Sequence, residues 1–142
     1  MQKLRVISIL TLCLTSFGVT VALAAVTIHA PKSARIAGGT IHVSARGLRR
    51  ATGYSLTLAA NPAPTRLTVC VARLATHKKR ATTVSFNVRI PKRLHCYEND
   101  SVSLGSTATK PGTYHLIVAV PDGPSGFAGT GSFARVAIKL TR

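Results

Sequence analysis

Acidic residues are scarce in this chain. Its 142 residues include three of them, Glu98, Asp100 and Asp122, against 19 Lys and Arg, so the formal net charge is +16. Enzyme sites commonly need carboxylates as bases, nucleophiles or orienting groups. The motifs G-x-S-x-G and H-E-x-x-H are also absent from the sequence. Catalysis is therefore not expected, and a hydrolase is the least favoured class of function.

Aromatic residues are few as well, with no Trp, three Tyr and four Phe. Proteins that bind single-stranded nucleic acid stack successive bases on exposed aromatic side chains. No specific nucleic-acid partner is expected, although a basic chain will bind nucleic acid non-specifically at low salt. The stretch GFAGTG (126–131) has the wrong glycine spacing for a dinucleotide loop, so no cofactor is expected either.

One long apolar run is present, at the N-terminus, and it has the layout of a secretory signal peptide. Lys3 and Arg5 precede the run, which closes on the small-residue motif Ala22-Leu23-Ala24. We predict cleavage after Ala24, which leaves one domain over residues 25–142, secreted and without a membrane span. An uncleaved anchor is the alternative, because the run approaches the roughly 20 residues that cross a bilayer.

Cysteines are limited to three, and Cys13 lies in the predicted signal peptide. Cys70 and Cys96 are then the remaining pair in a chain sent to an oxidising compartment, so we expect one intramolecular disulfide. A reactive thiol at Cys70 is the less favoured alternative.

The mature chain alternates apolar and polar residues between Gly and Pro turns, which predicts an all-β fold. Seven short antiparallel strands in about 100 residues are typical of an immunoglobulin-like (Ig-like) β-sandwich, with a small Greek-key barrel as the rival. The predicted strands are VTIHA (26–30), GTIHVSAR (39–46), GYSLTLA (53–59), RLTVCVAR (66–73), TTVSFNVRIP (82–91), GTYHLIVAVP (112–121) and SFARVAIKLT (132–141).

Two segments resemble secreted bacterial Ig-like modules. IAGGTIHVSARGLRRATGYSLTLAA (36–60) is similar to their early G-x-x-V-x-V-S-G-x-G-F-x-P-G-x-x-V-x-L stretch, and PGTYHLIVAVPDG (111–123) to their late PGTY strand. Ala45 stands where a Gly is usual and Leu48 where an aromatic residue is common. The resemblance implies the sandwich fold and leaves the function open, because such modules share little else.

The two neighbouring acids lie in LHCYENDS (94–101), just after Cys96. We expect this stretch to be a connection at one end of the sandwich, where Glu98 and Asp100 pair with Lys92 or Arg93. A calcium site is the alternative, but it would need about 6 to 8 oxygen ligands, most of them from elsewhere.

Basic residues gather in three segments, and strictly alternating strands would place two of them at one end together with a Gly-rich loop. The connections concerned are 46–52, 74–80 and 121–131. Such an end favours an anionic cell-surface polymer or an envelope protein as partner. Against this, the other end is also basic, and the charge can reflect composition alone. The predicted polyanion-binding residues are Arg46, Arg49, Arg50, Lys78, Lys79, Arg80 and Phe127.

Histidines suggest the alternative function, a small extracytoplasmic protein that handles copper or zinc. His29 and His42 occupy outward positions in the matching words TIHA and TIHV, in strands that could pair. No third ligand can be located, and a metal site needs one together with supporting contacts. No metal site is therefore predicted, and two solvated histidines are the favoured interpretation.

Overall fold

The computed structural model describes residues 26–48, 53–60, 68–99, 101–120 and 134–142. All regular structure in these residues is β-strand, which confirms the all-β prediction, and no helix among them is long and apolar enough to cross a membrane. The predicted signal peptide lies outside the described residues. The strands are β1 (Thr27–His29), β2 (Ser33–Arg35), β3 (Ile41–Arg46), β4 (Tyr54–Ala60), β5 (Thr68–His77), β6 (Thr83–Val88), β7 (Arg93–Glu98), β8 (Val102–Ala108), β9 (Gly112–Ala119) and β10 (Ala134–Thr141).

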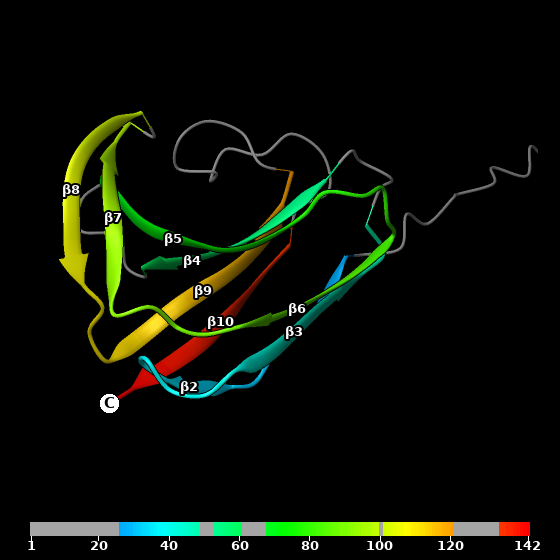
Figure 1. Ribbon diagram of the computed structural model, residues 1–142, viewed down its shortest axis with the longest axis horizontal. Helices are drawn as coiled ribbons and strands as arrows, with labels where there is room; N and C mark the ends of the chain where they lie inside the picture. Colours follow the sequence, from blue (N-terminus) through cyan, green and yellow to red (C-terminus); the bar gives the residue numbers. More distant parts are fainter. Residues whose placement is uncertain (1–25, 49–52, 61–67, 100, 121–133) are drawn as a thin grey trace, which may run out of the picture.

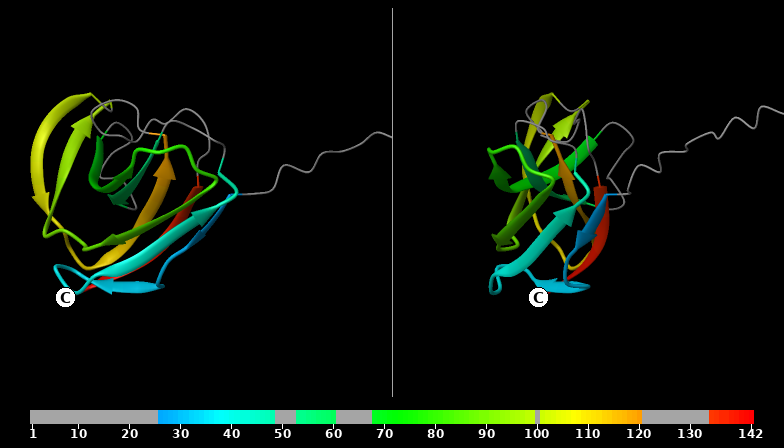
Figure 2. Two further views of the ribbon diagram at one scale, coloured as in Figure 1. Left: turned by 45° about the vertical axis from the view of Figure 1, so that its right-hand side comes forward. Right: turned by 90° about the vertical axis from the view of Figure 1, so that its right-hand side faces the viewer.

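Two sheets pack together in a sandwich-like arrangement (Figure 1). The smaller sheet has the order β1-β3-β6, and the larger has the order β2-β10-β9-β4-β5-β7-β8. In the right view of Figure 2, β3 of the small sheet runs at an angle to β10 of the large sheet. The chain moves from one sheet to the other on both sides of β2, between β3 and β4, and on both sides of β6.

The core lies between the sheets and follows the predicted alternation. Leu56 and Leu58 of β4 are fully buried, as are Leu116 and Val118 of β9. In β6 the pattern is strict, with Val84, Phe86 and Val88 buried and the residues between them exposed. A period of two with one apolar face is what a strand needs when one side of its sheet packs on a core. The strands predicted from this pattern are therefore present.

The predicted count of seven strands, all antiparallel, is wrong. The described residues form ten strands, because β2, β7 and β8 occur where connections were expected. β2 also pairs parallel with β10, through Lys139 opposite Ser33 and Thr141 opposite Arg35. Short or polar strands carry a weak periodic signal, so alternation alone did not reveal these three.

β4 differs from its predicted pattern because both of its faces are buried. Ser55 and Thr57 alternate with the core leucines, yet each is 1% exposed. β4 lies between β5 and β9 in the large sheet, and a second, small apolar cluster lies on this other face. The cluster consists of Ala59, Val71, Ile117 and Ala119, with Val69 and Tyr97 packed against it.

Candidate functional site

Arg46 and the turn between β5 and β6 lie at the same end of the molecule. In the β3–β6 ladder Arg46 is the register partner of Thr83, the first residue of β6. The backbone N–H of Leu48 then donates to the carbonyl of Thr82 at 3.0 Å, which extends the pairing into the connection. The chain that leaves β3 therefore runs beside the turn that carries Lys78, Lys79 and Arg80.

A glycine allows β4 to begin close to the same turn. A Cβ atom on Gly53 would stand 2.9 Å from the carbonyl oxygen of His77 and 3.6 Å from the Cα of Lys78. The first distance is shorter than real contacts allow, so Gly53 is required for this close approach. Tyr54 follows at once and is paired with His77. The predicted connection 74–80 is shorter than expected, because β5 extends to His77.

The third predicted connection starts at this end as well. Ala119, the last residue of β9, is the register partner of Ser55, which is adjacent to the Tyr54–His77 pair. The residues that border all three predicted connections thus lie at one end of the molecule. We call this the basic end and define it by Arg46, Lys78, Lys79 and Arg80. The predicted residues Arg49, Arg50 and Phe127 lie outside the described residues.

The side chains of the basic end are exposed, and Glu98, the acidic residue that the structure describes, is far from them. Arg46, Lys78, Lys79 and Arg80 are all exposed. Glu98 pairs with Thr68, at the opposite end of the ten-residue strand β5. At about 3.3 Å per residue, roughly 30 Å of strand separates that pair from His77. Glu98 therefore does not neutralise the basic end.

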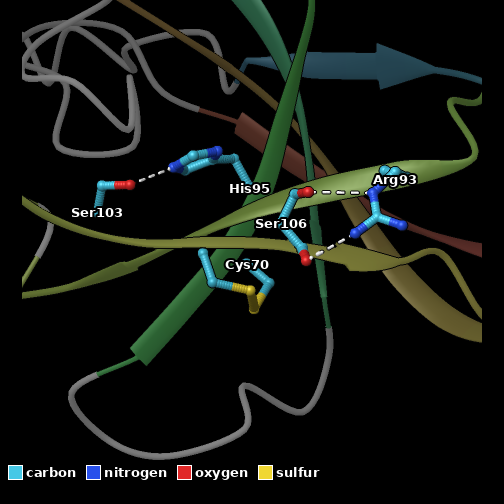
Figure 3. The surroundings of a disulfide bond; sticks show 6 residues. Cys70, Arg93, His95, Ser103 and Ser106 are labelled. Atoms are coloured by element: carbon cyan, nitrogen blue, oxygen red, sulfur yellow. Dashed lines mark hydrogen bonds between the residues drawn. A yellow bond between two sulfur atoms is a disulfide. The ribbon is translucent and has the colours of Figure 1, made fainter.

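The opposite end of the molecule is also basic, but Arg35 and Arg93 already have partners within the chain. Arg35 donates from Nε to the carbonyl oxygen of Arg142 at 3.2 Å. Arg93 donates from Nε to Ser106 Oγ at 3.0 Å and from its terminal nitrogen to the Ser106 carbonyl at 2.9 Å (Figure 3). For Arg46 the described part of the chain offers no such acceptor. Arg35 and Arg93 are thus engaged within the chain, whereas Arg46 has no hydrogen bond to the described residues.

Most of LHCYENDS is strand, which corrects the prediction of a connection. Its first five residues belong to β7, which pairs with β5 on one side and β8 on the other. Cys70 and Cys96 face each other across β5 and β7 and form the predicted disulfide, with Cα atoms 4.0 Å apart (Figure 3). The expected pairing of Glu98 with Arg93 is wrong, because Glu98 and Arg93 are at opposite ends of β7 and Arg93 binds Ser106. Asp100, the other acid of that prediction, lies outside the described residues.

His29 and His42 are on adjacent strands but not opposite each other. His29 is the partner of Ser44, so His42 occupies the diagonal position two residues further along β3. The Nδ1 atom of His42 is hydrogen-bonded to Oδ1 of Asn87 at 2.9 Å. The described residues contain no group of three or more His, Cys, Asp or Glu side chains that could hold a metal ion. The metal-handling alternative has no support from this geometry and stays a prediction.

The architecture defines an all-β, sandwich-like protein with one disulfide, and comparison with known proteins agrees with that class. No known protein family and no curated protein matches the sequence. Among solved structures the chain is similar to macromomycin, with a TM-score of 0.54 and 18% sequence identity, over 82% of this chain and 100% of that one. At this identity the likeness concerns the fold alone.

Proposed function

We propose that this protein is a secreted, non-enzymatic binding module with an Ig-like sandwich fold, and that its basic end binds an anionic polymer of the cell envelope. The observation that carries the proposal is the convergence of Arg46 with Lys78, Lys79 and Arg80. Four exposed cations at one end of the fold raise the local concentration of a polyanion and speed its encounter. Loops at one end of a rigid sandwich are a common place for recognition.

Secretion forms part of the same proposal. The disulfide supports it, because structural disulfides persist in oxidising compartments. Expression of the full chain in a secreting host should yield an exported product that begins at Ala25. Intact-mass measurement of that product tests the cleavage site, and a product that retains residues 1–24 at the membrane contradicts the proposal.

Binding is tested on the exported product with a panel of probes, namely heparin, polyphosphate and vesicles of anionic phospholipid, in a salt series. The test variant changes Lys78, Lys79 and Arg80 to Ser. The matched control changes Lys32, Lys92 and Lys110, at the opposite end, to Ser and so removes the same charge. If three contacts each contribute about 0.5 to 1 kcal/mol, the test variant should bind roughly tenfold more weakly or worse.

The comparison of the two variants decides whether a site exists. We expect one probe to bind at physiological salt, the test variant to lose that binding and the control to keep it. Equal loss of binding in the two variants would show that binding depends on net charge and not on a site. The same conclusion follows if the protein binds every probe equally and this binding disappears near physiological salt.

A further inference from the structure

We propose that β8 is a self-association edge, at which β8 of one copy pairs antiparallel with β8 of a second copy. The inference concerns the β7–β8 hairpin and stands independently of polyanion binding at the basic end. β8 is the outermost strand of the large sheet, at the left of Figure 1 and again in the left view of Figure 2. It pairs with β7 on one side and has no strand on the other among the described residues.

All seven residues of β8 are exposed, and they include the two exposed large hydrophobic residues of the described chain. Val102 is 55% and Leu104 is 52% exposed. None of the seven residues is charged, although the chain has 19 Lys and Arg. An uncharged edge strand with exposed apolar side chains is a template for pairing with another chain, and proteins usually protect such edges with charges, especially Lys.

The other three sheet edges are short or basic. β1 and β2 have three residues each, and β2 contains Arg35, whose guanidinium is bound to the carbonyl of Arg142. β6 has six residues, but its exposed positions are polar and Arg89 follows it. Short edges and edges with charges resist pairing with another chain. β8 is neither short nor charged; its ladder with β7 does shift register at Leu104, which lies between Ser103 opposite Tyr97 and Gly105 opposite Cys96.

The register shows which backbone groups of β8 are open to a partner. Cys70 and Cys96 are 4.0 Å apart at Cα, the short spacing of a non-hydrogen-bonded pair. Their neighbours Val69 and Tyr97 therefore exchange hydrogen bonds, and the backbone groups of Tyr97 point toward β5. Ser103 lies opposite Tyr97 in β8, so its own N–H and C=O point away from β7. In the other half of β8, the guanidinium of Arg93 donates a hydrogen bond to the Ser106 carbonyl.

A twofold axis through Ser103 satisfies both the backbone and the side chains. The two copies of Ser103 then exchange their N–H and C=O groups as a hydrogen-bonded pair. Val102 of each copy lies opposite Leu104 of the other, which forms two apolar cross-strand pairs. The contact is self-complementary, as a twofold interface requires.

Charge identifies a second copy, rather than an acidic protein, as the occupant. Residues 93–108 hold one basic residue, Arg93, and two acidic ones, Glu98 and Asp100, so the hairpin is the sheet edge where acids outnumber bases. An acidic partner gains nothing there, whereas a second copy of a strongly cationic chain meets the least repulsion. Antiparallel pairing also turns the Glu98 end of each hairpin toward the Arg93 end of the other.

Sedimentation velocity of the exported product tests the proposal. A single strand pair buries less area than a stable interface needs, so the series should extend over about 5 to 500 µM. The mass should rise from that of one chain toward that of two. The association should strengthen between about 0.05 and 0.5 M salt, because salt screens the repulsion between cationic copies. Polyanion binding weakens over the same range, so the two proposals fail separately.

Matched variants locate the contact. Val102→Lys with Leu104→Lys places two charges on the β8 edge, and Thr83→Lys with Ser85→Lys places two on exposed positions of the β6 edge. We expect the β8 variant to stay monomeric at least tenfold beyond the concentration at which wild type associates, and the β6 variant to associate like wild type at high salt. Ser103→Pro adds no charge, removes the outward N–H and should also stay monomeric.

Circular dichroism establishes that each variant is folded before its mass is compared. If the variant with Val102→Lys and Leu104→Lys does not fold, Ser103→Pro takes its place. A wild-type protein that remains a single chain throughout the series overturns the proposal. Association that persists in a folded β8 variant, or that the β6 variant loses equally at high salt, overturns it as well.

Discussion

Thr57 is the residue at which the fold departs most clearly from a simple alternating strand. Its side chain is 1% exposed, and its Oγ1 has no hydrogen-bond partner among the described residues. Ser55, on the same face of β4, is equally buried, but its Oγ donates a hydrogen bond to the carbonyl of Ala119 at 3.3 Å. A buried hydroxyl without a partner costs about 1 to 3 kcal/mol, because water no longer solvates it.

Thr57→Val should therefore stabilise the protein. Valine has nearly the same shape and replaces the unpaired hydroxyl with a methyl group, so we expect the free energy of unfolding to rise by about 1 kcal/mol. Urea unfolding followed by circular dichroism measures the change. Thr57→Ser is the control, because it keeps the hydroxyl and loses the methyl group, and it should destabilise the fold by about 1 kcal/mol. A loss of stability in Thr57→Val would mean that the hydroxyl has a partner.

Sequence patterns could predict which face of most strands packs on the core, but not the burial of Ser55 and Thr57. In β6 the side of each residue follows from period two alone, because one side of that sheet meets water. β4 has a second covered face, formed with Val71 and Ile117 from strands distant in sequence. Such a contact depends on the order of strands in the sheet, which the alternation within one strand does not encode.

The β7–β8 hairpin is the element that depends most on the disulfide. β7 pairs with β5 through four residue pairs, and Cys70–Cys96 is one of them. β8 pairs in turn with β7. The bridge closes a separation of 26 residues, which corresponds to roughly 3 to 4 kcal/mol on the chain-entropy account.

Cys70→Ala combined with Cys96→Ala should lower the free energy of unfolding by at least about 3 kcal/mol, since a small cavity adds to the lost constraint. Hydrogen exchange should show that the loss is concentrated in β7 and β8, while amides of β9 and β4 keep their relative protection. Reduced wild type, in which no cavity forms, serves as the control and should show the same pattern with a smaller total loss. Uniform loss of protection across both sheets would contradict this local role.

The elements that sequence reasoning missed are those without a buried apolar face. β8 is exposed throughout and contains Gly105 at φ +90°, a backbone conformation that interrupts regular pairing. β7 combines one fully buried residue, Leu94, with His, Cys, Tyr and Glu, a mixture that resembles a connection. The disulfide itself was predictable because the compartment and the cysteine count left a single pair. The pairing of Cys96 within a strand was not.

At the scale of the whole molecule, the charge opposes folding. The predicted mature chain carries 17 basic and three acidic residues, a formal charge of +14. Self-repulsion of this size destabilises a compact state relative to an expanded one. The placement of the charges, rather than their sum, could only be learned from the register, which brings Arg46 beside the turn that contains Lys78 and Lys79.

Salt should therefore stabilise the exported protein, and the two triple variants should reveal whether the repulsion is local. Between about 0.01 and 0.3 M salt, screening should raise the wild-type melting temperature. Replacing Lys78, Lys79 and Arg80 with Ser should raise the low-salt value by roughly 3 to 5 °C, which corresponds to about 1 kcal/mol, and should flatten its salt dependence. The set Lys32, Lys92 and Lys110 removes the same charge from three separate connections at the opposite end and should give a smaller gain. Differential scanning calorimetry measures all three proteins. Equal gains would mean that repulsion is spread evenly over the molecule, in which case the basic end is no more concentrated than the rest of the surface.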